Sequence, residues 1–159
     1  QWQDTLTLDL MASVRATRAA LPALLATGSA AIVAIASVNS TLSDPLVVDY
    51  CAAKAALSSV CKSLALEFGG QGLRVNTVSP GPVATDLWLG DHGVAHTVGS
   101  ATGSKPDDVA AKAASAMVTG RFTTPEEVAA AVVFLASEEA GNITGADIRI
   151  DGGMISTWP

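Results

Sequence analysis

Short apolar runs alternate along this chain with longer stretches of helical periodicity, and this alternation limits the possible folds more than any other feature. Residues 30–36 (AAIVAIA) form an uninterrupted apolar run, which is typical of a strand buried on both faces. Residues 73–78 and 148–150 predict two further strands. Apolar spacing and capping residues predict helices over residues 4–26, 46–68, 107–117 and 124–137. Strands that are joined through helices pair in parallel by right-handed crossovers. We therefore expect an α/β fold, part of a doubly wound parallel sheet with three strands and flanking helices.

Size and charge narrow the class of protein. The 159 residues, 49% of them hydrophobic, predict a single domain (1–159) with a substantial core. The net charge of −6 argues against partners such as nucleic acid or an anionic membrane surface, because both attract basic proteins. No apolar run approaches the roughly 20 residues that a membrane helix needs. Gln1 is not a natural start, so we expect the chain to begin within a longer protein. Its two cysteines are expected to be reduced, as in a cytoplasmic enzyme.

Three polar residues of the predicted sheet edge and helix suggest a reaction. Tyr50 and Lys54 are four residues apart and share one face of the predicted helix. An unperturbed tyrosine has a pKa near 10, and a cation within about 4–6 Å lowers such a value by roughly 1–3 units. Ser37 follows the first predicted strand, at the carboxyl edge where parallel sheets bind ligands. Ser37 could bond a substrate oxygen while Tyr50 exchanges its proton, which suits hydride transfer at a carbinol or carbonyl carbon.

An ordinary pair of helix neighbours is the competing interpretation of Tyr50 and Lys54. Tyr50 is the only tyrosine in the chain, so a lysine four residues after it is an uncommon coincidence. Spacing alone leaves both interpretations open.

Several motifs in a fixed order resemble the short-chain dehydrogenase/reductase family. The matching segments are Ser37, YCAAK at 50–54, RVN at 74–76, SPGPVAT at 79–85, TPEEVA at 124–129, FLAS at 134–137 and residues 144–153. The resemblance covers the whole chain except residues 86–121.

This resemblance implies a Rossmann-like fold and an oxidoreductase that moves hydride between NAD(H) or NADP(H) and a small-molecule secondary alcohol or ketone. It implies that Ser37, Tyr50 and Lys54 are the catalytic residues. The residues implied to bind the cofactor are Tyr50, Lys54, Pro80, Gly81, Val83 and Thr85. Residues 86–121 would form a substrate lid, and the assembled protein would be a homo-oligomer, specifically a homotetramer.

Two features depart from the family pattern. The glycine-rich TGxxxGxG loop and the NNAG segment are absent, and Asp9 stands where the family has a catalytic-site Asn. Residues 69–72 (GGQG) do not replace the loop, because they follow a helix and precede a strand, whereas a phosphate cradle needs the reverse order. We interpret them as a helix C-cap. A non-catalytic fragment, or a subunit that needs a partner chain to supply the missing half, therefore stays open as an alternative.

Weaker signals have competing explanations. His92 and His96 could suggest a metal pair, but residues of the lid exposed to solvent are the favoured interpretation. A Ser-His-Asp hydrolase lacks the G-x-S-x-G elbow. Trp88, within the lid, could contact the substrate or only cover it. Asp9 could lie near Lys54, or it could face solvent or an arginine such as Arg15 or Arg18.

Overall fold

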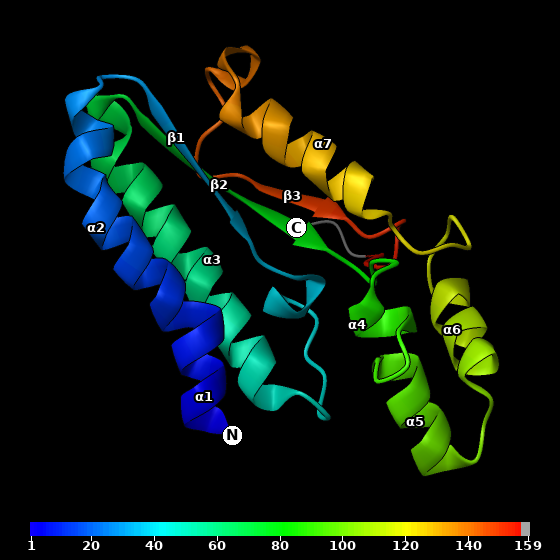
Figure 1. Cartoon of the computed structure of the whole chain (residues 1–159). Helices are drawn as coiled ribbons and strands as arrows, with labels where there is room; N and C mark the ends of the chain where they lie inside the picture. The colour runs from blue at the N-terminus through cyan, green and yellow to red at the C-terminus, as the bar shows by residue number, and fades with distance from the viewer. Residues whose placement is uncertain (157–159) are drawn as a thin grey trace. The chain divides into compact units, whose positions relative to one another are not determined.

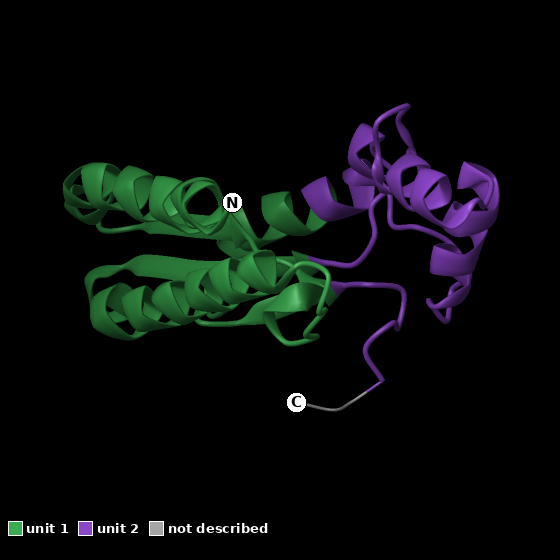
Figure 2. Ribbon diagram, turned by 90° about the horizontal axis from the view of Figure 1, so that it is seen from below, with its two compact units in different colours: residues 1–79, 130–149 green, residues 80–129, 150–159 purple. Residues whose placement is uncertain are grey.

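The computed structural model describes residues 1–156, which form two compact units (Figure 2). Unit 1 comprises Gln1–Ser79 and Ala130–Arg149, and unit 2 comprises Pro80–Ala129 with the segment from Ile150. The prediction of a single domain over 1–159 concerns the whole chain and stays a prediction. The helices and strands are α1 (Trp2–Leu6), α2 (Ala12–Ala26), β1 (Ala30–Ile35), α3 (Val48–Phe68), β2 (Leu73–Pro80), α4 (Asp86–Leu89), α5 (Val94–Thr102), α6 (Pro106–Ser115), α7 (Pro125–Ala136) and β3 (Asp147–Ile150) (Figure 1).

The three strands form one sheet in the order β1-β2-β3, as the alternating sequence predicts. β1 pairs with β2 in parallel, with Ala30 opposite Leu73 and Ile35 opposite Val78. β2 lies in the middle and is almost entirely buried. β1 is only half-buried, so the prediction that it is covered on both faces is wrong for the described chain. The physical reason is its position, since no strand among residues 1–156 pairs with its outer edge.

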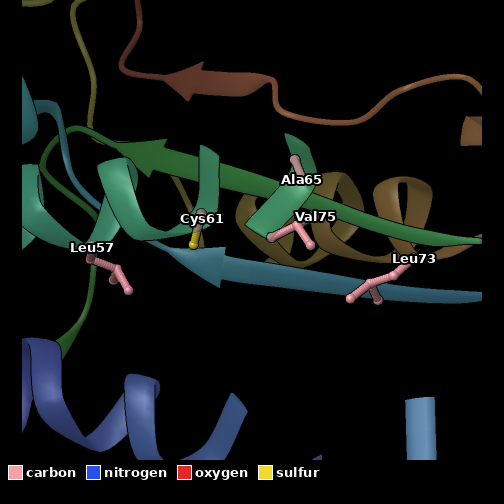
Figure 3. Close-up of a cluster of buried hydrophobic side chains, with 5 residues drawn as sticks. All are labelled: Leu57, Cys61, Ala65, Leu73 and Val75. Carbon is pink, nitrogen blue, oxygen red and sulfur yellow. The ribbon is translucent and has the colours of Figure 1, made fainter. Parts of the chain in front are cut away.

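The core of unit 1 lies between α3 and the sheet (Figure 3). Leu57, Cys61 and Ala65 follow one another at intervals of four residues on α3, and they contact Leu73 and Val75 of β2. Four leucines from the helical segment before β1 pack against the same cluster: Leu10, Leu21, Leu24 and Leu25. Complete burial of one Leu side chain contributes about 1.5–3 kcal/mol to the stability of the folded state. The contacts of this cluster therefore hold α3 firmly against β2.

The opposite face of α3 is open in this chain. Leu66 is 77% exposed and Val48 is 53% exposed. Leu64, by contrast, packs against the core cluster. The nearly uninterrupted apolar pattern of residues 46–68 therefore has two causes: one face is buried within unit 1, and the other presents apolar side chains to the surroundings.

A glycine lies where the turn after α3 comes close to the residues that precede β1. Gly72 follows a 3₁₀ turn (Gly69–Gln71) at the end of α3 and has φ of 83°. The carbonyl of Gly72 accepts a hydrogen bond of 3.0 Å from the amide of Ala30, the first residue of β1. A Cβ on Gly72 would overlap the carbonyl oxygen of Gly28. The interpretation of residues 69–72 as the end of a helix is confirmed.

The RVN motif anchors the turn that leads into β3. Arg74 donates hydrogen bonds to the carbonyls of Leu135 and Ser137, at 2.7 and 2.9 Å. Asn76 is 1% exposed; its side chain donates to the carbonyl of Ile143 at 2.8 Å and accepts from the amide of Ala146 at 3.0 Å. Arg74 and Asn76 thus satisfy backbone groups that would otherwise lack partners.

Unit 2 contains more helix than the sequence predicts. α6 (Pro106–Ser115) confirms the helix expected near residues 107–117, but α4 and α5 were not predicted. Glycines obscure their pattern, although Gly99 of α5 has a packing reason: a Cβ there would lie 2.8 Å from the carbonyl oxygen of Ser104. Trp88 packs edge-on against Phe122, with ring centroids 5.3 Å apart. Trp88 therefore contributes to the packing of unit 2 itself.

The start of α7 has the expected reciprocal cap. The amide of Thr124 donates to the Glu127 carboxylate at 2.8 Å, and the amide of Glu127 donates to the Thr124 hydroxyl at 3.3 Å. Arg121 forms two further hydrogen bonds to the same carboxylate, at 2.9 and 2.6 Å. The bond from Arg121, followed by that from the Thr124 amide, lowers the pKa of Glu127 to about 2.

Candidate active site

The residues predicted to be catalytic all lie in unit 1, near the carboxyl end of β1. Ser37 comes two residues after Ile35, the last residue of β1, and is 7% exposed. Its hydroxyl accepts a hydrogen bond of 3.1 Å from the amide of Asn39, which caps a short 3₁₀ turn (Val38–Ser40). The serine is thereby held at the strand end rather than on a free loop.

Tyr50 and Lys54 lie together on the first turns of α3. The Lys54 ammonium is 5.5 Å from the centroid of the Tyr50 ring. It also donates a hydrogen bond of 3.2 Å to the carbonyl of Ile35 at the end of β1. Lys54 thus links the tyrosine to the strand that precedes Ser37, and the expectation that the helix and the strand end meet at one edge agrees with this contact.

Asp9 forms an ion pair with Lys54, with 3.3 Å between Oδ1 and Nζ. The two side chains are 24% and 12% exposed. Asp9 lies within a π-helical turn (Thr7–Met11) between α1 and α2, where the sequence predicts one continuous helix. Such turns are rare and are found frequently at functional sites. The alternative that Asp9 faces solvent or an arginine is wrong.

A second carboxylate beside the tyrosine was missed by the sequence reasoning. Asp49 is 6% exposed and accepts a hydrogen bond of 2.8 Å from the Thr5 hydroxyl of α1. This bond, together with a bond from the amide of Tyr50, lowers the pKa of Asp49. The contact fixes the start of α3, and therefore Tyr50, against the first helical segment. No sequence signal separates Asp49 from an ordinary acidic residue in a first helical turn.

The segment implied to line the nicotinamide lies in unit 2. Pro80 ends β2, and the amide of Gly81 donates to the carbonyl of Ile150 at 3.0 Å. A Cβ on Gly81 would lie 3.1 Å from the Cα of Asp151, so close packing alone accounts for this glycine. Val83 forms an isolated bridge with Thr123, and Thr85 precedes α4. Their role toward a cofactor stays a prediction.

The chain is similar to known proteins in both sequence and fold. A family model described as enoyl-(acyl carrier protein) reductase matches residues 1–155. A solved oxidoreductase of the short-chain dehydrogenase/reductase family from Burkholderia thailandensis is 34% identical, with a TM-score of 0.84 over 98% of this chain and 57% of that one. The chain belongs to the short-chain dehydrogenase/reductase family.

Two other members of this family indicate the range of its substrates. D-threitol dehydrogenase of Mycolicibacterium smegmatis is 41% identical over 156 residues, which are 96% of this chain and 54% of that protein. L-Sorbose reductase of Gluconobacter frateurii, solved with NADPH and L-sorbose, is 34% identical, with a TM-score of 0.86 over 99% of this chain and 59% of that one. The chain spans about half the length of the curated relatives that it matches.

The described residues fit one end of a nicotinamide dinucleotide. The Lys54 ammonium has three donors and two acceptors in this structure, Asp9 and the Ile35 carbonyl, which leaves a donor for a ribose hydroxyl. A pyrophosphate, in contrast, needs a strand followed by a glycine-rich loop and a helix N-terminus. β1 is followed by Ala36 and Ser37, and β2 by Gly81 and Pro82, so no such loop exists among residues 1–156.

The remaining candidates show no sign of a second site. His92 and His96 are both exposed. Residues 1–156 contain no group of three or more His, Cys, Asp or Glu that could hold a metal ion. Every helix in this described part of the chain is too short or too polar to span a bilayer.

Proposed function

We propose that the protein of which this chain forms part is a nicotinamide-dependent oxidoreductase, in which Tyr50 is the acid/base for a secondary alcohol or ketone. The observation that carries the proposal is the position of the Lys54 ammonium, 5.5 Å from the Tyr50 ring and bonded to the end of β1. A cation in this place favours the phenolate form of a tyrosine. This position of the cation supports the proposed role of Tyr50 as the group that exchanges a proton with the substrate.

The residues act as follows when an alcohol is oxidised. The Ser37 hydroxyl donates a hydrogen bond to the substrate oxygen and holds it beside Tyr50. The Tyr50 phenolate takes the hydroxyl proton as the carbon–oxygen double bond forms. Bound NAD⁺ or NADP⁺ would accept the hydride that leaves the carbinol carbon. Lys54 supplies positive charge beside the phenolate and a donor for the nicotinamide ribose. In reduction each transfer runs backward, and Tyr50 gives its proton to the alkoxide.

The relatives support this class of reaction. One is named for the oxidation of D-threitol, and another was solved with NADPH and L-sorbose. Both compounds carry secondary alcohol or ketone groups. We therefore infer that the substrate is a small hydroxylated or carbonyl compound and that the cofactor is NAD or NADP. The cofactor-contacting residues on this chain would be Tyr50, Lys54, Pro80, Gly81, Val83 and Thr85.

A second candidate function is a non-catalytic fragment, or a subunit that works only with a partner chain. The absence of a phosphate loop in residues 1–156 and the unpaired edge of β1 favour it. Calorimetric titration of the 159-residue chain with NADH separates the two cases. Micromolar binding would show that this chain suffices, whereas weak or undetectable binding would show that the adenosine half needs further residues.

The test of catalysis is Tyr50→Phe in the complete natural polypeptide. Loss of a general acid–base group should reduce kcat by at least about 10², and the fold should survive because only one hydroxyl is removed. Ser59→Ala is the matched control, because Ser59 is exposed on the same helix and its loss should leave kcat unchanged. A Tyr50→Phe variant with near-normal turnover would refute the proposed role.

We also propose a homo-oligomer, specifically a homotetramer, in a cytoplasmic setting. The exposed Leu66 and Val48 of α3 support a face covered by a second copy, because large apolar patches are rarely left in water. Leu66→Arg should weaken the assembly by placing an unpaired charge in the interface. Asp4→Arg, on the exposed start of α1, should not. Sedimentation that gives the same assembly for Leu66→Arg and the parent protein would contradict this.

A further inference from the structure

We propose that Asn39 is a positioning residue for Ser37: it makes the serine hydroxyl a hydrogen-bond donor and directs its proton until a substrate oxygen accepts it. The inference rests on the proposed function, because it concerns how Ser37 reaches the substrate, but that function requires no particular residue at position 39. It starts from the contacts between these two residues, which both lie in unit 1 just after β1.

The first step is to count the bonds that the Ser37 hydroxyl can form. A hydroxyl has one proton to donate and two lone pairs that accept. One lone pair accepts the backbone amide of Asn39 at 3.1 Å, a bond between residues i and i+2 that serine often forms in turns. Ser37 is 7% exposed, so its proton needs an acceptor within the protein. The acceptor that residues 1–156 provide is Oδ1 of Asn39, at 3.4 Å.

The second step is the orientation of the Asn39 side-chain amide. Its Nδ2 donates to the carbonyl of Leu42 at 3.0 Å and to the sulfur of Cys51 at 3.6 Å. An amide turned the other way would place Oδ1 against the Leu42 carbonyl, and two acceptors cannot bond each other. The network therefore turns Oδ1 toward Ser37. Because Cys51 follows Tyr50 on α3, Asn39 also connects the serine to the helix that carries the tyrosine.

The third step is the strength of the bond to Oδ1. Most O–H···O hydrogen bonds have a length of about 2.5–3.0 Å, so the bond of 3.4 Å between Ser37 and Asn39 is long and weak. A substrate oxygen at the usual distance would replace it at little cost. Asn39 thus gives the proton a defined direction before the substrate binds, and it competes only weakly with the substrate afterwards.

The experiment is a double-mutant cycle in the complete natural polypeptide, with NAD⁺ or NADP⁺ as oxidant and propan-2-ol, the simplest secondary alcohol, as the probe. Asn39→Ala should lower kcat/KM for the alcohol about two- to tenfold, the range that one ordinary hydrogen bond spans. In a Ser37→Ala background the same substitution should cause no further loss, because the hydroxyl on which it acts is gone. The KM for the cofactor should not change, since the Asn39 side chain bonds none of the residues proposed to bind it.

Ser40→Ala is the matched control, because Ser40 follows Asn39 in the same 3₁₀ turn and its hydroxyl accepts from Ser58 at 3.3 Å without contacting Ser37. It should leave kcat/KM unchanged. An Asn39→Ala variant equal to the parent, or one that loses the same factor with and without the Ser37 hydroxyl, would overturn the inference and leave the proposed function in place. Normal turnover of both Ser37→Ala and Tyr50→Phe would instead refute the proposed function, and the role of Asn39 with it.

Discussion

Asn76→Asp is the change that tests the architecture around β2 most sharply, because it replaces one donor group by an oxygen without altering the shape of the side chain. The amide nitrogen of Asn76 donates to the carbonyl of Ile143 at 2.8 Å, and its oxygen accepts from the amide of Ala146 at 3.0 Å. The residue is 1% exposed. An ionised Asp would therefore put a carboxylate oxygen against a carbonyl oxygen, out of reach of water.

The size of the effect follows from burial. Breaking a buried interaction so that an uncompensated charge remains costs about 3–5 kcal/mol, which is a large part of the roughly 5–15 kcal/mol that stabilises a typical domain. A protonated Asp, however, can donate to Ile143 and still accept from Ala146. The folded variant will hold this proton to a higher pH than the unfolded chain, in which Asp has a pKa near 3.9. The folded state then binds more protons, so the free energy of unfolding falls as the pH rises above about 4.

Denaturant unfolding of the parent and variant chains at about pH 5 and pH 8 measures this difference. The cost of Asn76→Asp should be several kcal/mol at pH 8 and clearly smaller at pH 5. Asn76→Leu is the control, because it removes both hydrogen bonds and cannot ionise, so its cost relative to the parent should not depend on pH. A cost of Asn76→Asp below about 1 kcal/mol, the scale of a single ordinary hydrogen bond, or one equal at both pH values, would refute the account of Asn76 given above.

Other residues give simpler expectations. Leu57→Ala should lower the free energy of unfolding by about 2–5 kcal/mol in the same denaturant assay, because Leu57 is 3% exposed in the core cluster; a loss below 1 kcal/mol would contradict this. Burial raises the pKa of the Cys61 thiol to about 11, so at pH 8 roughly one molecule in a thousand carries the thiolate there. A disulfide reagent should therefore modify the half-buried Cys51 first, and equal rates would argue against this burial. The hydrogen bond from Arg121 lowers the pKa of Glu127 from 4.5 to about 2. The ionised Glu127 therefore contributes its full stabilisation of the folded state above about pH 4.5, and this contribution is lost as the pH falls through about 2. Glu127→Gln should accordingly lower Tm at pH 7 but not near pH 2.

The strands and the site helix could be predicted because their signals are local. An uninterrupted apolar run predicts β1, and helical spacing alone places Tyr50 and Lys54 on one face of α3. The π-helical turn at Thr7–Met11 could not be predicted, because its residues fit an ordinary helix equally well. Helices α4 and α5 were missed for the opposite reason. Their glycines are needed for close approach of the backbone, and they weaken the helical pattern.

Long-range polar contacts were the other part that could not be predicted. Asp49 and its partner Thr5 are 44 residues apart, and nothing in either local sequence indicates the bond. Asn76 and Ile143 are 67 residues apart. The RVN motif marked the importance of these positions but not their structural role. The resemblance to the family did identify Asp9 as a residue of interest, whereas the ion pair with Lys54 required the structure.

The close contact between Gly72 and residues 28–30, at the amino end of β1, has a consequence for Ser37. The hydrogen bond from the amide of Ala30 to the carbonyl of Gly72 fixes where β1 begins to pair with β2. A strand presents alternate side chains to opposite faces, so a slip of one residue would turn every side chain of β1 over. At about 3.3 Å per residue, Ser37 lies roughly 20 Å beyond this contact. A residue inserted within β1, after Ala30, would keep this bond, yet it would shift Ser37 by one position along the strand and out of register with Tyr50 and Lys54.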